Sequence, residues 1–244
     1  MRPSSGRSGD TMRRRGAVIG AIATLALGGT VDSLAAQGSA DRARSARQPA
    51  VARAGHIPIV KQAFHNNCET AALSMMLAAA GRPVDQRVLQ QALPRSGPLD
   101  PITRTDDGVW IWGDPDQGFV GRVAGGGVAG GFGVYQGPVR RLAARYGVRL
   151  ENLTRHPAAD IFARLRSGRP VIAWIGLSEG PYVRWRTPSA KLIGVNFGEH
   201  TVLLTGLNGD SVLVNDPLTG TRATWTMTQF EEKWRLLGER ALGQ

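Results

Sequence analysis

Cysteine is nearly absent from this 244-residue sequence, in which Cys68 is the only one. A single cysteine cannot form a disulfide within the chain, so a folded domain must rely on its hydrophobic core, and 42% apolar residues are enough for one. Histidine is also scarce, with four residues, and the sequence has neither a His-Glu-x-x-His motif nor ligand pairs at zinc spacing. We therefore expect no metal and no cofactor.

Two other common functional signatures are missing, and acidic residues are few. The sequence has no Gly-x-Ser-x-Gly elbow of the serine hydrolases and no Gly-Lys-Ser/Thr phosphate loop.

The sequence has 19 Asp+Glu against 30 Lys+Arg, a net charge of +11, and residues 1–55 hold +6 of that charge. Because no block of basic and aromatic residues occurs in the remainder, we expect no nucleic-acid partner.

The apolar run at residues 16–28 is shorter than the roughly 20 residues that a membrane span needs. It follows a basic segment at 12–15 and precedes small residues at 33–36, an order that is typical of an export signal. We therefore expect a signal over residues 1–36 and a secreted or cell-envelope protein. An uncleaved signal would associate the N-terminus with the envelope. Residues 37–55 lack apolar periodicity and are predicted to be a disordered linker, which leaves 56–244 as one domain.

Hydrophobic periodicity divides that domain into a helical first part and a β-rich second part. Apolar positions at helical spacing predict helices over 68–80, 84–93, 139–146, 158–166 and 228–237. Runs rich in β-branched residues predict strands over 171–177, 200–207, 211–215 and 221–226, with a tight hairpin at Asn208-Gly209-Asp210. Helices followed by an antiparallel meander predict an α+β domain.

Cys68 is predicted to lie in the first turn of its helix, with Asn66 as the N-cap and Glu69 as the partner in a capping box. The unpaired N–H groups at a helix start favour an anion by roughly 0.3–1 kcal/mol, or up to about 2 kcal/mol when partly buried. The thiolate is the nucleophilic form of cysteine, so this position favours thiol chemistry. The alternative, a small buried apolar side chain, stays open.

His200 opens the most apolar predicted strand, and Asp216 follows one hairpin later. If the two strands pair around residues 208–210, both side chains lie near the same end of the ladder. Asp216 could then accept a hydrogen bond from the imidazole and fix its tautomer, as the third member of a triad does. A structural histidine and an ordinary turn aspartate are the alternatives. Gln62, six positions before Cys68, could donate to a tetrahedral oxyanion.

Nine glycines lie between residues 118 and 137. One interpretation is a binding loop whose bare backbone approaches an extended ligand. The other, which we favour slightly, is a flexible surface loop.

Four motifs in fixed order resemble the papain-like cysteine peptidases of the bacteriocin-leader-processing type, in particular the secreted single-domain branch (peptidase family 39-like). The motifs are Gln62-x5-Cys68 at a helix start, Gly198-Glu199-His200-Thr201-Val202, Val214-Asn215-Asp216-Pro217-Leu218-x-Gly220, and the glycine–aromatic segments at 118–121 and 131–135; Phe230-x-x-x-Trp234 also agrees. The resemblance spans about residues 60–237.

The resemblance implies a papain-like α+β fold in which an N-terminal helical part, with the nucleophile helix, packs on an antiparallel β-sheet. It assigns the nucleophile to Cys68, the general base to His200, the orienting residue to Asp216 and the oxyanion donor to Gln62. The transporter-linked members follow the cysteine with Gly-Pro, whereas this chain has Glu69-Thr70, so their double-glycine specificity is not carried over.

The implied function is an exported cysteine peptidase with a peptide or protein substrate, acting as a monomer through residues 56–244. Two other functions stay open. One is a catalytically idle peptide-binding module on the same fold, and the other is a thiol-dependent transpeptidase or amidase of the cell envelope.

Overall fold

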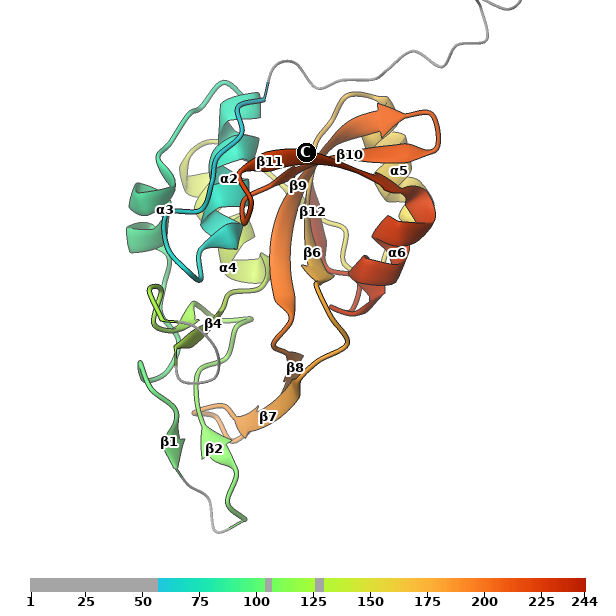
Figure 1. Ribbon diagram of the computed structural model, residues 1–244. Helices are drawn as coiled ribbons and strands as arrows, with labels where there is room; N and C mark the ends of the chain where they lie inside the picture. Colours follow the sequence, from blue (N-terminus) through green and yellow to red (C-terminus); the bar gives the residue numbers. More distant parts are fainter. Residues whose placement is uncertain (1–56, 104–106, 126–129) are drawn as a thin grey trace, which may run out of the picture. The chain divides into compact units, whose positions relative to one another are not determined.

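The computed structural model describes residues 57–103, 107–125 and 130–244 (Figure 1). The predicted export signal at 1–36 and the predicted linker at 37–55 lie outside the described residues, as do residue 56 and the middle of the glycine-dense segment. Within these ranges, no helix combines the length and the apolar character that crossing a membrane requires.

Five helices occur in the described residues, and each coincides with a predicted one to within a few residues. They are α2 (Cys68–Ala79), α3 (Gln86–Ala92), α4 (Gln136–Arg145), α5 (Ala158–Arg166) and α6 (Met227–Arg235). Helix α2 is buried continuously from Cys68 to Leu77, which explains why it lacks a charged face. It stops at Gly81, whose φ of +71° a glycine adopts without steric cost.

A six-stranded antiparallel sheet has the order β11-β10-β9-β6-β12-β5. Its four predicted strands are confirmed, while the short β5 and β12 are not predicted from the sequence. The strands are β5 (Glu151–Asn152), β6 (Val171–Gly176), β9 (Glu199–Asn208), β10 (Ser211–Asp216), β11 (Thr221–Thr226) and β12 (Ala241–Gly243).

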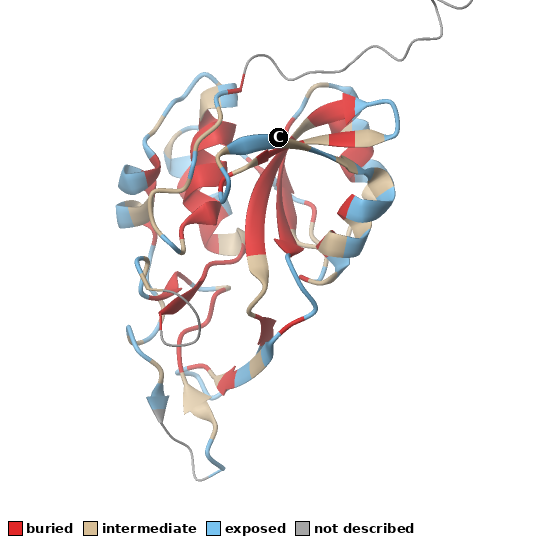
Figure 2. Cartoon of the chain, viewed as in Figure 1, coloured by how far each residue is buried: buried red, intermediate tan, exposed pale blue. Residues whose placement is uncertain are grey.

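Helices cover both faces of this sheet. In Figure 1, α2 and α4 lie on one side of β6 and β9, and α5 and α6 lie on the other. Alternate residues of β6 enter two separate cores: Ile172 and Trp174 pack in the cluster that contains α2, and Val171, Ala173 and Ile175 pack with α5 and α6. Figure 2 shows this burial along β6, β9 and α2. Because both faces are buried, the central strands are continuous apolar runs in the sequence.

One register shift in β9 decides which side chains share a face of the sheet. The pairing with β10 changes by one residue at Val214, which pairs with Leu204 and leaves Thr205 as the extra residue. Such a bulge moves all later side chains to the other face. In the shifted register Asp216 is aligned with position 202, two residues from His200, so the two side chains share a face. In the unshifted register they would lie on opposite faces.

A second sheet, with the order β1-β2-β7-β8, is not predicted from the sequence. Its strands are β1 (Ile102–Thr103), β2 (Trp110–Ile111), β7 (Tyr182–Arg186) and β8 (Leu192–Asn196). These strands are short or carry charged and exposed residues, so they lack an apolar run that would reveal them. Trp112 and Trp185, with ring centroids 5.2 Å apart, join this sheet to the core.

Most of the described part of the glycine-dense segment is buried, at residues 118–121 and 130–135, so the slightly favoured prediction of a flexible surface loop is wrong for those residues, whereas Arg122 and Ala124 are exposed. It forms a two-stranded sheet of β3 (Val120–Gly121) and β4 (Gly131–Gly133). Phe119, Phe132 and Tyr135 anchor it in the core. Glycine is needed because the two backbones touch: a Cβ on Gly121 would lie 2.5 Å from the Gly131 Cα.

We expect Leu203→Ala to lower the free energy of unfolding by about 2–5 kcal/mol, because Leu203 is fully buried in the core that contains α2 and its removal leaves a cavity. Urea unfolding followed by tryptophan fluorescence measures the change. Leu192→Ala is the control, since Leu192 is 48% exposed and its loss should change stability by less than about 0.5 kcal/mol. Equal losses in the two variants would contradict the description of this core.

Candidate active site

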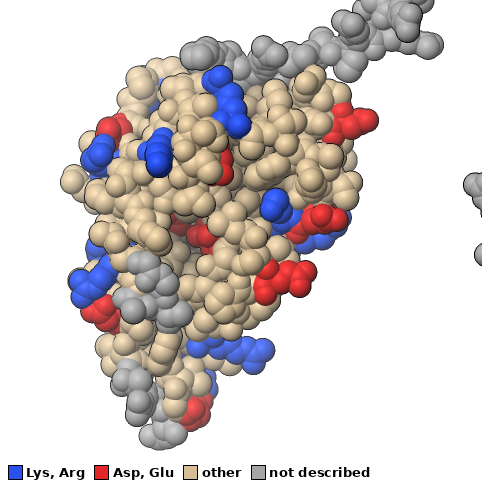
Figure 3. All heavy atoms as spheres, in the orientation of Figure 1, with Lys and Arg blue, Asp and Glu red and all other residues tan. Residues whose placement is uncertain are grey.

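A cleft of about 260 Å³ brings together segments from distant parts of the chain. Its lining consists of Gln62, His65, Asn66, Cys68, Glu69, Gly131, Phe132, Leu177, Phe197, Glu199, His200 and Leu218. Three of the four predicted site residues are therefore in its wall, and the fourth, Asp216, reaches it through His200. Figure 3 shows acidic side chains recessed in a hollow on this face of the molecule.

Cys68 begins α2, as predicted, and is 5% exposed. The predicted cap is wrong, because the N-cap is Asn67 and no side chain caps the helix. The Asn66 side chain instead donates to the carbonyls of Arg122 and Gly125, which ties the helix start to the glycine-dense segment.

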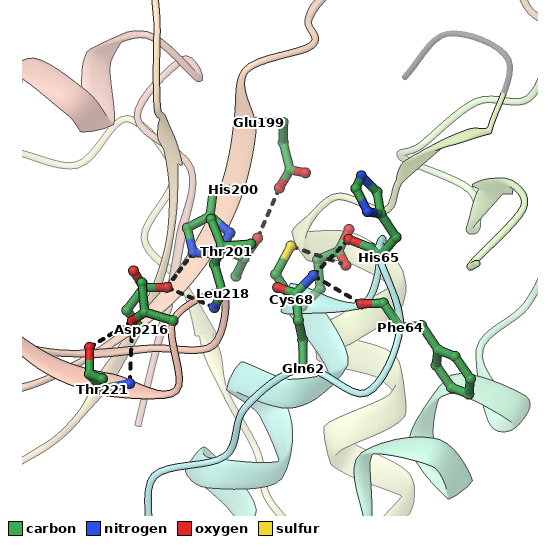
Figure 4. Close-up of polar contacts among 12 residues, drawn as sticks. Gln62, Phe64, His65, Cys68, Glu199, His200, Thr201, Asp216, Leu218 and Thr221 are labelled. Carbon is green, nitrogen blue, oxygen red and sulfur yellow. Dashed lines mark hydrogen bonds and ion pairs between the residues drawn. The ribbon is translucent and has the colours of Figure 1, made fainter. Parts of the chain in front are cut away.

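His200 and Asp216 form a hydrogen bond of 2.7 Å between the Nε2 and Oδ1 atoms (Figure 4). The pairing around residues 208–210 that the sequence predicts is thus confirmed. His200 is 3% exposed, and Asp216 Oδ1 also accepts from the Leu218 N–H at 2.8 Å. Burial alone would raise the pKa of Asp216, but these hydrogen bonds and the imidazole outweigh it and lower the pKa below its ordinary value. Asp216 therefore stays ionised as an acceptor for His200.

Gln62 lies beside the loop that follows Asp216, since its backbone N–H donates to the Pro217 carbonyl at 2.8 Å. Its side-chain Nε2 donates to the carbonyls of Phe64 at 3.0 Å and His65 at 2.6 Å. An amide nitrogen carries two hydrogens, so both are engaged. The Oε1 atom is buried and has no partner among the described residues. The oxyanion role of Gln62 stays a prediction that requires its side chain to turn.

The Glu69 side chain points at the sulfur instead of back to the helix start. It is fully buried, its Oε1 accepts from the Val134 N–H at 2.6 Å, and its Oε2 accepts from the Cys68 thiol at 3.6 Å. Burial raises the pKa of Glu69 to about 7, against hydrogen bonds that lower it. Nothing near Glu69 in the sequence reveals this orientation, because its partner is 65 residues away.

Glu199 is a second carboxyl group near the sulfur, and the sequence gives it no role. Its Oε1 accepts from the Thr201 hydroxyl at 3.0 Å. Burial first, and then the charge of Glu69, raise the pKa of Glu199 well above its ordinary value. The signal that could have found it is its position immediately before His200, as the only acidic residue of β9.

The resting thiol is protonated, which reverses the effect that we expected from the helix start. Burial, followed by the charges of Glu199 and Glu69, raises the pKa of Cys68 well above that of an ordinary thiol, although hydrogen bonds with Thr201 oppose the change. The penalty for a buried thiolate beside acids thus exceeds the stabilisation that a helix start provides.

The same three groups are the candidate ligands for a metal. The sulfur of Cys68 and carboxylate oxygens of Glu69 and Glu199 lie within 4.8 Å of one another. A metal would need all three deprotonated, and in its absence burial raises the pKa of each group. The sequence-based expectation of no metal therefore stays a prediction.

Comparisons with known proteins agree on one family and one fold. The model of a family described as "Peptidase_C39 like family" matches residues 55–242. The chain is 31% identical over 183 residues to the uncharacterized protein YvpB of Bacillus subtilis (strain 168), covering 73% of this chain and 69% of the relative. It is also similar to a candidate C39-like peptidase from Bacillus anthracis, with 27% identity, a TM-score of 0.64, and coverage of 77% of this chain and 94% of that one.

A double glycine motif protease from an AMS/PCAT transporter, solved with its leader peptide, is a more distant similarity at 18% identity and a TM-score of 0.45 over 78% of this chain and 91% of that one. The papain-like α+β fold predicted from the sequence, with the helix of Cys68 packed on an antiparallel sheet, is confirmed by the family match and the C39-like structure.

We expect Glu69→Gln to reduce the pH dependence of stability. The carboxyl of Glu69 has a pKa of about 7 in the folded protein against 4.5 ordinarily, so its contribution to stability is complete below pH 4.5 and is lost as the pH rises through 7. The difference amounts to about 3 kcal/mol at pH 8. Urea unfolding at pH 5 and pH 8, under reducing conditions, should show that the wild type loses about 2.5 kcal/mol more than the variant, because part of the difference is already lost at pH 5.

The control for this measurement is Glu232→Gln, at an exposed position of α6, which should follow the wild type at both pH values. If Glu69→Gln loses as much stability at pH 8 as the wild type does, the carboxyl of Glu69 does not titrate as described.

Proposed function

Because the chain belongs to the peptidase C39-like family, we propose that it is an exported cysteine peptidase that hydrolyses peptide bonds. The observation that carries the proposal is the 2.7 Å His200–Asp216 hydrogen bond in the wall of the cleft that Cys68 also lines. Three elements distant in the sequence supply a nucleophile, a base and an orienting carboxylate to one place, which is the arrangement that acyl transfer requires.

The roles follow from which atoms are engaged. Asp216 holds His200 by Nε2, so Nε2 carries the proton and Nδ1 is left as the basic nitrogen. We assign to Nδ1 the removal of the proton from the Cys68 thiol as the sulfur attacks the peptide carbonyl. The imidazolium then protonates the leaving amine, and a water molecule, activated by the same nitrogen, hydrolyses the acyl-enzyme.

Stabilisation of the tetrahedral oxyanion is assigned to the start of α2 and to Gln62. The first N–H groups of a helix have no partner within the helix, and the N–H of Cys68 is one of them. The side-chain amide of Gln62 adds a second donor if substrate binding turns it away from the carbonyls of Phe64 and His65. The Oε1 atom supports such a turn, because it is buried without a hydrogen-bond partner among the described residues, which destabilises the present orientation of the side chain.

A peptide substrate fits the lining of the cleft. Phe132 and Phe197 provide apolar wall, and Leu177 and Leu218 are 50% and 44% exposed beside them, so an extended chain could cover apolar surface here. Export and a secreted or envelope location rest on the sequence pattern of residues 12–36. We also propose that the protein acts as a monomer and uses neither a metal nor a cofactor.

We expect Cys68→Ala to abolish peptide cleavage and His200→Ala to lower kcat by about 10²–10⁴-fold, the usual contribution of a general acid–base group. Asp216→Asn should lower kcat as well, because it no longer fixes the tautomer of His200. Mass spectrometry of a peptide library incubated with the enzyme identifies substrates and cut sites, and fluorogenic versions of those peptides then give the rates.

The matched control is His156→Ala, since His156 lies on the surface with Asp160 and should leave turnover unchanged. Cleavage that survives Cys68→Ala would contradict the proposal. Product masses separate the two alternatives: amide exchange or loss of ammonia indicates a transpeptidase or amidase, and peptide binding that Cys68→Ala does not change, without turnover by the wild type, indicates an idle binding module.

A further inference from the structure

Glu69 is a buried acid that the proposed chemistry does not use. It follows the nucleophile directly, at a position where the sequence departs from the Gly-Pro of the transporter-linked peptidases. The side chain has no exposed surface, although glutamate is almost never fully buried unless it is paired. Among the ion pairs of the described residues, none includes Glu69. Its burial therefore needs another explanation.

The surrounding backbone fixes the Glu69 carboxylate in one orientation. The Val134 N–H donates to Oε1 at 2.6 Å, which leaves Oε2 to accept from the Cys68 thiol at 3.6 Å. Space for the carboxylate exists because residue 133 is a glycine: a Cβ there would lie 2.3 Å from Oε1, and its φ of +119° is one that other residues rarely adopt. Three features thus combine to place one oxygen of Glu69 against the nucleophile.

We propose that Glu69 is a positioning residue that keeps the Cys68 thiol in its protonated resting form while the Glu69 carboxylate is ionised, and that protonation of Glu69 makes the thiol available for reaction. The proposal deepens the proposed function and rests on it for its catalytic consequence. It concerns the sulfur itself, however, and can be measured without any substrate.

The groups that face Glu69 in the cleft determine the direction of the effect. They are Cys68 on α2, Glu199 and His200 on β9, and His65 before α2. The reactive arrangement carries protons on Glu69 and His200 and none on Cys68. It forms when the thiol passes its proton to His200 while Glu69 holds a proton taken from solvent, so the total number of protons is unchanged by the transfer.

As the pH rises through about 7, Glu69 loses its proton, and the thiolate would then form beside a carboxylate. The reactive arrangement is therefore populated on the acidic side of neutrality and disfavoured above it. Glu199 also raises the pKa of the thiol when it is charged, but among the hydrogen bonds of the described residues it accepts from the Thr201 hydroxyl, whereas Glu69 accepts from the thiol itself. An ordinary thiol behaves differently, since its thiolate fraction increases about tenfold per pH unit up to its pKa.

The test is the rate at which iodoacetamide alkylates Cys68 between pH 5.5 and 9, measured by intact-protein mass spectrometry on the full chain. At pH 8 we expect Glu69→Gln to react about tenfold faster than the wild type, the change that one pKa unit produces. At pH 5.5 the two rates should agree within about twofold, because Glu69 is then neutral in both proteins. Glutamine can still accept the Val134 N–H, so the variant keeps this contact.

Glu232→Gln is the matched control, since it neutralises an exposed carboxyl on α6 that does not line the cleft and should react like the wild type at pH 8. Equal rates for Glu69→Gln and the wild type at pH 8 would overturn the proposal, and so would an acceleration by Glu232→Gln as large as that by Glu69→Gln. If Glu69→Gln does not fold, the wild type alone decides. Its rate should stay nearly flat from pH 7 to 8.5 where that of glutathione rises, and a parallel rise would refute the role.

The two proposals fail in different ways. The predicted alkylation pattern without any peptide cleavage supports the role of Glu69 at the sulfur and rejects the peptidase. Cleavage by a wild type whose alkylation does not respond to Glu69→Gln supports the peptidase and rejects the role of Glu69. Where both hold, kcat/KM of the wild type falls above about pH 7, and Glu69→Gln moves this fall to higher pH.

Discussion

The extra residue in β9 is the constraint on which the site depends. Strands present alternate side chains to opposite faces, so an imidazole and a carboxylate from paired strands can meet only if the register puts them on one face. The shift at Thr205 provides that register for His200 and Asp216. Without it, His200 would be buried with no acceptor from β10, and an unpaired buried polar group costs on the order of 1–3 kcal/mol. The extra residue therefore allows the polar His200 to lie at the end of an apolar strand with Asp216 as its hydrogen-bond partner.

The surroundings of the acids in the cleft shift their pKa values in opposite directions. Asp216 is hydrogen-bonded by the imidazole and by backbone N–H groups, so its pKa is lowered and it remains charged. Glu69 and Glu199 are surrounded by apolar groups and by each other, so their pKa values are raised. Titratable groups whose environments separate their pKa values in this way are the usual basis for assigning acid and base roles. Cys68 lies next to the two acids whose pKa values are raised.

The sequence predicts those parts of the molecule that depend on local patterns. Helix α2 and the hairpin at residues 208–210 follow from periodicity and turn residues, and the order of the motifs places Cys68, His200 and Asp216 in one site. The bulge at Thr205 has no such signal, because its surroundings form an unbroken strand pattern. The orientation of Glu69 could not be predicted either, because it depends on a glycine and a backbone N–H about 65 residues away, which only the tertiary fold brings near.

The backbone bond between the Gln62 N–H and the Pro217 carbonyl joins the segment before the nucleophile to the loop that follows Asp216. Gly220 packs against the Lys61 side chain, where a Cβ would lie 2.8 Å from the nearest carbon, so the two segments are in close contact at a second point. Moving these two segments apart would therefore break a backbone hydrogen bond and open a packed contact. A wider ligand would be accommodated more readily by rotation of the Phe132 and Phe197 side chains, which line the same cleft and meet edge to face, because side-chain rotation breaks no backbone hydrogen bond.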